Sequence, residues 1–170
     1  MEQPFLDEIE ASVPALRRYA RALTRDADRA DDLVQDCIER AIRKRRLWAP
    51  TAPLRAWLFK ILLNLYRNEV RQRRRRGEQV PLDAMTAEPG MPAPQPGRIA
   101  LAEMARALER LPDEQREALL LVVLEGASYQ EAAGILGIPA GTLMSRLGRA
   151  RAALRTLTGS ADEPRLRTVK

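Results

Sequence analysis

Histidine is absent from this sequence of 170 residues, and cysteine occurs once, at Cys37. A lone cysteine excludes an internal disulfide, and without histidine a zinc site built from thiolate and imidazole ligands is not expected. Serine–histidine and cysteine–histidine nucleophilic catalysis are excluded because both use an imidazole as the base. We therefore expect a protein that is not an enzyme and that binds no metal and no cofactor.

Long apolar runs are also missing. The longest has seven residues, Ala118 to Leu124, whereas a membrane-spanning helix needs about 20. The amino-terminal stretch MEQPFLDEIE is acidic and amphipathic, unlike the basic and then apolar pattern of a signal peptide. The sequence therefore predicts a cytoplasmic protein without membrane insertion of its own.

Acidic residues are scarce relative to basic ones in the first part of the chain only. Residues 1–76 hold 18 Lys and Arg against 11 Asp and Glu, a net charge of +7. Residues 77–170 hold 11 against 12, a net charge of −1. A polyanionic partner for the first part is therefore a better expectation than a small acidic substrate.

Proline and glycine concentrate between these two parts. The stretch GEQVPLDAMTAEPGMPAPQPG, residues 77–97, holds five of the twelve prolines and three of the nine glycines, with three acids and no base. This density of Pro and Gly cannot continue a helix and leaves little apolar surface to bury. We predict a flexible linker at 77–97 between a domain at 1–76 and a domain at 98–158, followed by a tail at 159–170.

The spacing of apolar residues predicts helices throughout both domains, and no alternating strand pattern occurs. The predicted fold class is therefore all-α, with two small helical domains. The helices are expected at 13–23, from a cap at Asp26 or Asp28 onward, from Leu54 into the arginine run at 71–76, at 99–111, and from Pro112 to a stop at Gly126.

The helix that begins at Leu54 has two different faces. With about 100° per residue, Leu54, Leu58, Ile61 and Leu65 form an apolar core stripe. Roughly opposite lies a polar stripe, which contains no acid: Lys60, Asn64, Arg67, Arg71 and Arg74. Such a stripe fits a helix that lies against nucleic acid, because Arg binds phosphates and both Asn and Arg can read base edges. The alternative is a solvated helix face that ends in a basic tail.

Residues 128–151, SYQEAAGILGIPAGTLMSRLGRAR, have the pattern of a helix-turn-helix. Ser128 and Glu131 can form a capping box, and Gly137 can supply the left-handed residue of the corner. The outer face of the second helix carries small and basic residues, among them Ser145 and Arg149, which permit close approach to a major groove. An ordinary helical hairpin is the alternative.

These units, in this order, resemble the bacterial extracytoplasmic-function sigma factors (group 4), the minimal type of RNA polymerase sigma factor with only domains 2 and 4. The resemblance covers nearly the whole chain: residues 26–41 are similar to regions 2.1–2.2, 53–76 to regions 2.3–2.4, and 111–154 to region 4. It implies an alternative sigma factor that directs core RNA polymerase to specific promoters in a stress or envelope response. It also implies a non-catalytic subunit whose partners are core polymerase, promoter DNA and an anti-sigma factor.

The resemblance also assigns roles to residues. Trp57 would assist strand opening, the loop Leu47–Pro53 would capture a flipped base of the −10 element, and the second domain would contact the β flap. The segment that would dock on the β′ clamp coiled coil contains Asp32, Leu33, Gln35 and Asp36. The residues that would read the −10 element are Lys60, Asn64, Arg67, Asn68, Arg71 and Arg74. Those that would read the −35 element are Met144, Ser145, Gly148, Arg149 and Arg151.

Three positions depart from the usual pattern of that family. Met144 replaces a commonly basic residue and Gly148 a commonly large one, so base contacts at these two positions are expected to differ. Leu63 stands where arginine is common, on what the helix spacing predicts to be an outer side of its helix. We therefore expect an exposed Leu63 that serves a protein partner.

Two other functions fit parts of the sequence. A stand-alone helix-turn-helix transcription regulator would use the second domain but would need no polymerase-docking segment. An all-helical adaptor would use the basic faces to bind acidic proteins. Neither alternative accounts for all three matching segments.

Overall fold

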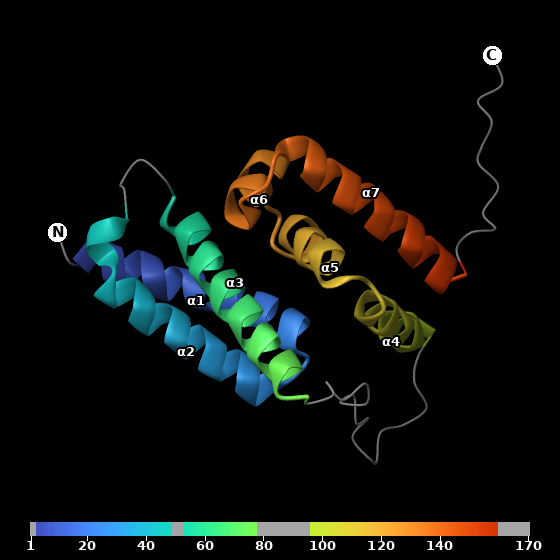
Figure 1. The fold of residues 1–170 in the computed structure, drawn as a ribbon, viewed down its shortest axis with the longest axis horizontal. Coiled ribbons are helices and arrows are strands. Elements are labelled where there is room, and N and C mark those ends of the chain that lie inside the picture. The colour runs from blue at the N-terminus through green and yellow to red at the C-terminus, as the bar shows by residue number, and fades with distance from the viewer. Residues whose placement is uncertain (1–2, 49–52, 78–95, 160–170) are drawn as a thin grey trace.

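The computed structural model describes residues 3–48, 53–77 and 96–159. The prediction of an all-α fold is confirmed, because every regular element in these ranges is a helix (Figure 1). The first domain contains α1 (Gln3–Thr24), α2 (Ala27–Arg43), the 3₁₀ turn η1 (Arg45–Leu47) and α3 (Leu54–Arg75). The second domain contains α4 (Pro96–Glu109), α5 (Asp113–Leu119), the π-helical turn η2 (Leu120–Leu124), α6 (Tyr129–Leu136) and α7 (Ala140–Leu157).

Helix α1 begins ten residues before the predicted start at Val13. Its early turns bury Phe5 and Ile9, which extend the apolar face formed further along by Leu16 and Tyr19. Pro14 therefore lies inside the helix instead of in its first turn. The burial of two large side chains offsets the roughly 3 kcal/mol that an internal proline costs.

A tight corner joins α1 to α2. Arg25 has a φ of +58°, a left-handed conformation that is uncommon for a residue with a side chain. The carboxylate of Asp26 then accepts a hydrogen bond from the backbone N–H of Arg29 at 3.0 Å and caps α2. Of the two predicted caps, Asp26 and Asp28, the structure uses Asp26.

Helix α3 is buried on two sides. Of the predicted core stripe, Leu54 and Leu58 are fully buried, whereas Ile61 and Leu65 are only half-buried. Leu62, next to that stripe, is fully buried instead. A second apolar stripe, Phe59, Leu63, Tyr66 and Val70, follows the spacing i, i+4, i+7 and i+11 along a neighbouring face. The expectation of an exposed Leu63 is wrong, because its side chain is only 1 % exposed.

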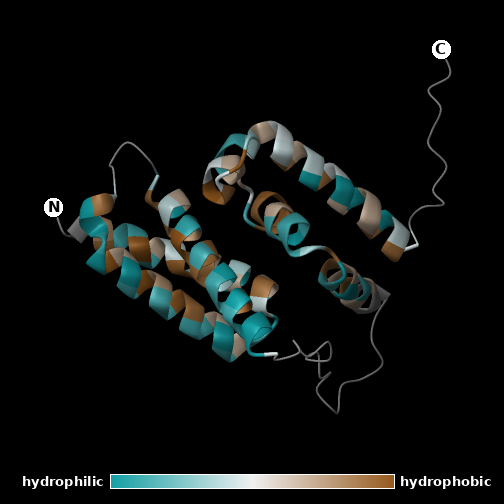
Figure 2. Ribbon diagram, viewed as in Figure 1, coloured by the Kyte–Doolittle hydropathy of each residue, from teal (hydrophilic) through white to brown (hydrophobic). Residues whose placement is uncertain are grey.

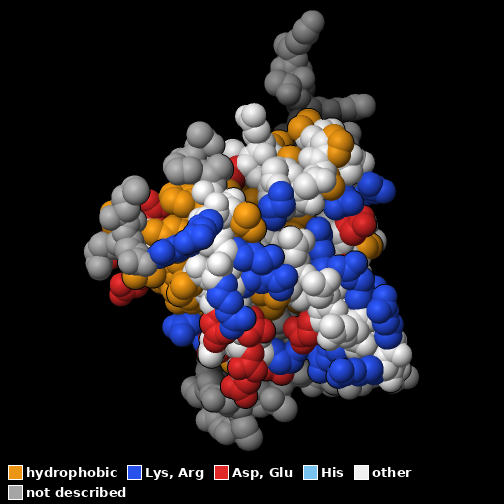
Figure 3. All heavy atoms as spheres, turned by 60° about the vertical axis from the view of Figure 1, so that its left-hand side comes forward, with side chains coloured by type: hydrophobic (Ala, Val, Ile, Leu, Met, Phe, Trp, Pro, Cys, Tyr) orange, Lys and Arg blue, Asp and Glu red, His pale blue; other side chains and the backbone are white. Residues whose placement is uncertain are grey.

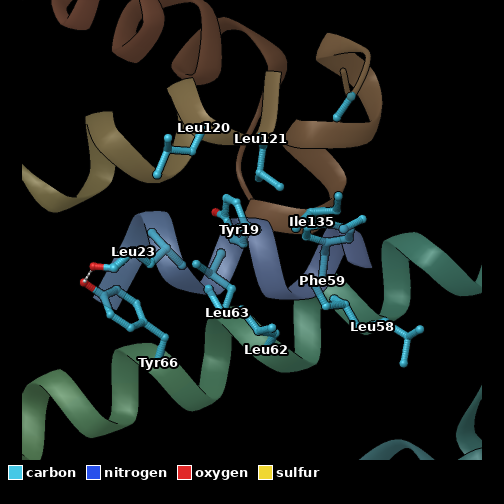
Figure 4. Close-up of a cluster of buried hydrophobic side chains, with 14 of the residues drawn as sticks. Tyr19, Leu23, Leu58, Phe59, Leu62, Leu63, Tyr66, Leu120, Leu121 and Ile135 are labelled. Carbon is cyan, nitrogen blue, oxygen red and sulfur yellow. Dashed lines mark hydrogen bonds between the residues drawn. The ribbon is translucent and has the colours of Figure 1, made fainter. Parts of the chain in front are cut away.

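The second apolar stripe is covered by α1 and by the second domain. Figure 4 shows Phe59 and Leu63 on α3 beside Tyr19 on α1, with Leu121 of η2 and Ile135 of α6 on the far side. The rings of Tyr19 and Phe59 meet edge to face with centroids 5.3 Å apart. Figure 2 shows apolar and polar residues alternating in bands along the helices of both domains, as in amphipathic helices. The two domains therefore share one hydrophobic core.

Two tyrosines satisfy their hydroxyl groups within this shared core. Tyr19 donates a hydrogen bond to the backbone carbonyl of Glu117 at 3.2 Å, which links α1 to α5. Tyr66 donates to the carbonyl of Leu23 at 3.3 Å and accepts one from Arg116. Because burial without a partner would cost each hydroxyl about 1–3 kcal/mol, these bonds fix how α5 sits against the first domain.

Cys37 lies in the core of the first domain, and its thiol contacts the carbonyl of Leu58 at 3.4 Å. Desolvation raises the pKa of this thiol from 9.0 to about 12. We therefore predict that native protein does not react with a thiol reagent such as DTNB at mildly alkaline pH, and that the thiol reacts fully after denaturation.

The same pKa shift predicts how stability depends on pH. The contribution of Cys37 is complete below pH 9 and is lost as the pH rises toward about 12, because the unfolded thiol ionises first. The free energy of unfolding should therefore fall less steeply with pH in a Cys37→Ala variant over that window. Rapid DTNB labelling of the native protein would contradict this account.

Candidate nucleic-acid interface

The polar stripe of α3 is divided by the second domain. Lys60, Asn64 and Arg71 are exposed, as predicted for residues that contact DNA. Arg67 and Arg74 lie at the edge of the stripe nearest the second apolar stripe, and both are ion-paired with α5. Arg67 is partly buried in its pair, whereas Arg74 stays largely exposed, so the structure leaves most of the predicted DNA surface open and engages two of its arginines in ion pairs.

The open part surrounds a hollow of about 250 Å³ beside Trp57. Helix α3 contributes Lys60, Asn64 and Asn68 to its lining, and α2 contributes Arg40. The complete lining is Arg40, Lys44, Leu47, Trp57, Lys60, Ile61, Asn64, Leu65 and Asn68. Because these residues include three cations and no acid, the hollow is suited to an anionic ligand that also offers apolar or hydrogen-bonding surface.

Trp57 has two roles in the structure. Its side chain is half-buried and packs against the core of the first domain. The same side chain lines the hollow. An indole fixed in this way offers a rigid stacking surface next to basic groups.

Arg71 and Asn68 hold each other on the surface of α3. The guanidinium of Arg71 donates to the amide oxygen of Asn68 at 2.6 Å and to the backbone carbonyl of Arg67 at 3.2 Å. Both side chains remain accessible to solvent. Their mutual contact orients them without burying them.

Arg67 is held by the second domain. Its guanidinium donates three hydrogen bonds to the two carboxylate oxygens of Glu117, at 2.7, 3.2 and 3.3 Å. The hydrogen bond with Glu117 is the main reason why the pKa of Arg67 is raised above its usual value. The side chain of Glu117 is only 4 % exposed, so this pair belongs to the interface between the domains.

A second carboxylate at the interface, Glu125, has a side chain that is 1 % exposed. It accepts hydrogen bonds from Arg18 of α1 at 2.9 Å and from Arg55 of α3 at 3.2 Å. Arg55 also lies over the ring of Phe59, with 5.1 Å between its Cζ and the centroid. These arginines lie outside the polar stripe, so Glu125 joins the domains without covering a predicted DNA contact.

The predicted polymerase-docking residues lie on α2. Asp32, Gln35 and Asp36 are exposed and form one polar surface. Leu33 is 5 % exposed and belongs to the core of the first domain. Only the three polar residues of this predicted set are therefore available to a partner without rearrangement of α2.

The predicted helix-turn-helix is present in the second domain. The Ser128 hydroxyl accepts a hydrogen bond from the backbone N–H of Glu131 at 3.1 Å, as a cap requires. Gly137 has a φ of +67° and a ψ of +37°, the left-handed corner between α6 and α7. Leu143 and Leu147 are fully buried against the rest of this domain.

The outer face of α7 brings together the residues predicted to read the −35 element. Met144, Ser145, Gly148 and Arg149 are exposed, and Met144 is 58 % exposed. No atom lies within 4 Å of the position a Cβ of Gly148 would take, so this face is open to close approach. Arg151 is also exposed, but its guanidinium donates to the Tyr129 hydroxyl of α6 at 3.1 Å.

Much of the loop predicted to capture a flipped base lies outside the described residues, which omit 49–52. At its start, Leu47 is 71 % exposed and belongs to the hollow beside Trp57. The ring of Trp48 packs against Phe5 of α1 with centroids 5.7 Å apart. The described beginning of the loop therefore lies next to the open part of the polar stripe.

On the face drawn in Figure 3, Lys and Arg side chains are more widespread than acidic ones, which gather in separate groups.

None of the helices in the described ranges is long and apolar enough to cross a membrane. The sequence patterns did not predict the interface between the domains, including Glu117 and Glu125. One feature of the sequence indicated this interface: because of the second apolar stripe, α3 has more apolar surface than packing against α2 alone requires. That signal did not show which element would cover the stripe.

Two family models match the chain. Residues 9–63 match "Sigma2 domain of PhyR", and residues 101–154 match "Sigma-70, region 4". A curated relative, the ECF RNA polymerase sigma factor EcfG of Rhodopseudomonas palustris, is 44% identical over 154 residues. That alignment covers 89% of this chain and 83% of the relative.

Two solved structures are similar over almost the whole chain. The sigma factor RpoE of Bartonella quintana, in complex with the anti-sigma factor NepR, has a TM-score of 0.76 and is 36% identical, with 95% of this chain and 99% of that chain covered. CnrH in complex with the cytosolic domain of CnrY has a TM-score of 0.71 and is 29% identical, with 95% and 92% covered. The arrangement of both domains is therefore similar to that in known structures.

The corner of the helix-turn-helix generates a stability prediction. We expect Gly137→Ala to lower the free energy of unfolding by about 1–2 kcal/mol, because its left-handed φ is strained for any residue with a Cβ. Ser128→Ala should cost about 1 kcal/mol through loss of the cap. Gly134→Ala is the control: this glycine has open space around it inside α6, so alanine should stabilise by about 0.5–1 kcal/mol. Urea unfolding followed by circular dichroism measures all three, and a neutral Gly137→Ala would contradict the assignment.

Proposed function

Because the chain belongs to the extracytoplasmic-function family of RNA polymerase sigma factors, we propose that the hollow beside Trp57 on α3 binds the −10 element of its promoters. The observation that carries this proposal is the convergence of an indole, two amides and three cations around one hollow. The residues of α3 that would make these contacts are Trp57, Lys60, Asn64 and Asn68, with Arg71 beside them.

Membership of this family settles the class of activity. The chain is an alternative sigma factor, a non-catalytic specificity subunit that directs RNA polymerase to promoters. The expectation that it is not an enzyme is confirmed on the same ground. A stand-alone regulator and an adaptor for acidic proteins are set aside, since neither belongs to this family.

The chemistry of the hollow fits unpaired DNA. An unstacked base can stack on the indole of Trp57, and such stacking contributes about 1–3 kcal/mol per base. The amides of Asn64 and Asn68 can donate to and accept from base edges. Lys60, Arg40 and Lys44 surround these groups and can bind the phosphates on either side.

We propose that the outer face of α7 reads the −35 element. A recognition helix that follows a left-handed corner is the element that enters the major groove in helix-turn-helix proteins. Ser145 and Arg149 are the two hydrogen-bonding groups at the centre of this face, and Gly148 between them permits close approach. Met144 offers apolar contact where a basic residue is common in the family.

Contacts with the polymerase are assigned to both domains. Asp32, Gln35 and Asp36 form the exposed polar surface of α2 that we propose docks on the β′ clamp coiled coil. The second domain would contact the β flap. Because these contacts are made within the transcription machinery, we propose that the protein acts in the cytoplasm. We also place it in group 4 of the sigma factors.

An anti-sigma factor is the expected regulator. RpoE and CnrH, to which this chain is similar over nearly its whole length, were both solved in complexes with such partners, NepR and the cytosolic domain of CnrY. We propose that a protein of the same kind holds this chain inactive until a stress or envelope signal releases it.

Run-off transcription tests the proposed function. Purified protein would be combined with core RNA polymerase on a library of genomic promoter fragments. We expect transcripts from a small set of promoters that share −10 and −35 elements and that are absent with core polymerase alone. If a competent core enzyme gave no promoter-specific transcripts with this protein, the proposal would be overturned.

Arg71→Ala tests the open part of the polar stripe. Removal of one charge-assisted contact to a phosphate should reduce initiation by about tenfold and should lower the salt dependence of binding by about one unit. Arg17→Ala is the matched control, because Arg17 is an exposed arginine on α1 and its loss changes the net charge equally. Equal effects of the two variants would show that the stripe acts only through net charge.

A further inference from the structure

Arg67 cannot offer the Nε–Nη2 edge of its guanidinium to Glu117 and to a promoter phosphate at the same time. We propose that Glu117 acts as an internal substitute for a phosphate of the −10 element, so that Arg67 becomes available to DNA only when its ion pair with Glu117 is broken. This inference rests on the proposed role of α3 in promoter binding. It adds a device by which the free protein limits its own affinity for DNA.

The geometry of the pair supports the substitution. The Arg67 guanidinium donates to both carboxylate oxygens of Glu117, with the shortest distance 2.7 Å. Arginine binds phosphate through the same two-pronged arrangement of N–H donors. Since its Nε and Nη2 donors are already occupied, DNA must displace the carboxylate to bind this edge of the guanidinium.

The burial of the pair strengthens the competition. The side chain of Glu117 is 4 % exposed and that of Arg67 is 31 % exposed. Salt and solvent therefore screen this contact less than they screen a contact on an open surface. A phosphate that approaches from outside has no comparable access to the guanidinium while the second domain is in place.

A second pair acts in the same direction. Arg74 of the polar stripe is bound to Asp113 of α5, whose other oxygen accepts a hydrogen bond from Arg116. Two of the five residues in the stripe are thus paired with acids of one helix of the second domain. Arg74 stays exposed in this pair, as do Lys60, Asn64 and Arg71, so Arg67 is the residue of the stripe that the second domain partly buries.

The interface is built so that it can open. Replacement of protein partners by water or phosphate leaves none of these charges stranded, whereas their burial in the closed form is opposed by desolvation. One carboxylate oxygen of Glu125, Oε1, is buried and accepts no hydrogen bond within the described residues. The closed arrangement is held by apolar contact, hydrogen bonds and ion pairs, and the pairs of Glu117 and Asp113 are those that engage the stripe.

The test compares glutamate-to-glutamine variants in the full chain. Glu117→Gln removes the charge that holds Arg67 and keeps the backbone carbonyl to which Tyr19 donates. The probe is a pool of short fluorescein-labelled single-stranded DNA oligonucleotides of random sequence, with affinity measured by fluorescence anisotropy at several salt concentrations. We expect about tenfold tighter binding and a salt dependence steeper by about 0.7, the value for one added phosphate contact on single-stranded DNA.

Two control variants lose the same charge. Glu125→Gln weakens the interface but releases only Arg18 and Arg55, which lie outside the polar stripe. Glu114→Gln removes an exposed carboxylate that pairs with Arg146 inside the second domain. We expect each to change DNA affinity by less than about twofold. In an Arg67→Ala background, Glu117→Gln should have no effect.

Each outcome decides between alternatives. Unchanged DNA binding by Glu117→Gln, or an equal gain in Glu125→Gln, would overturn the proposed competition. If helical circular dichroism showed that Glu117→Gln does not fold, Glu117→Asp would serve instead, because it shortens the side chain and should also tighten binding. The run-off assay of the unaltered protein tests the proposed function separately. If that protein gives promoter-specific transcripts but Glu117→Gln binds DNA no more tightly, only the competition between Glu117 and DNA is refuted.

Discussion

The burial of α3 on two faces is the constraint on which the rest of the structure depends. One face packs on α2 through Leu54 and Leu58, as in any small bundle. The other, which includes Phe59 and Leu63, is covered by α1 and by the second domain (Figure 4). Because α3 also carries the polar stripe, the packing of the second domain determines which polar side chains face solvent. Core packing and promoter recognition are thus coupled within one helix.

The sequence was informative wherever structure is local. The cap at Asp26, the cap at Ser128 and the left-handed corner at Gly137 depend on residues within one turn, and the structure confirms each. The all-α class was predictable from periodicity for the same reason. The exposure of Leu63 and Arg67 depended on contacts with residues about 50 or more positions away, which no local pattern can specify. Arg67 lies beside the second apolar stripe of α3, and it lies in the interface because the second domain covers that stripe.

The candidate site was predictable in chemistry but not in accessibility. Residue types and spacing pointed to Lys60, Asn64 and Arg71, and these are exposed in and beside the hollow. Spacing alone could not distinguish them from Arg67 and Arg74, which belong to the same stripe. The distinction comes from Glu117 and Asp113 on α5, the first of which lies 50 positions from Arg67 along the chain.

The π-helical turn η2 determines the direction in which the side chains that follow α5 point. The backbone N–H of Glu125 bonds to the carbonyl of Leu120, five residues earlier, so this turn holds one residue more than an α-helical turn. Each residue added to or removed from a helix rotates the remainder of the chain about the helix axis by about 100°. The extra residue therefore aims Glu125 at Arg18 and Arg55 while Leu121 still faces the shared core. A homologue with one residue fewer here would have to join its two domains through different side chains.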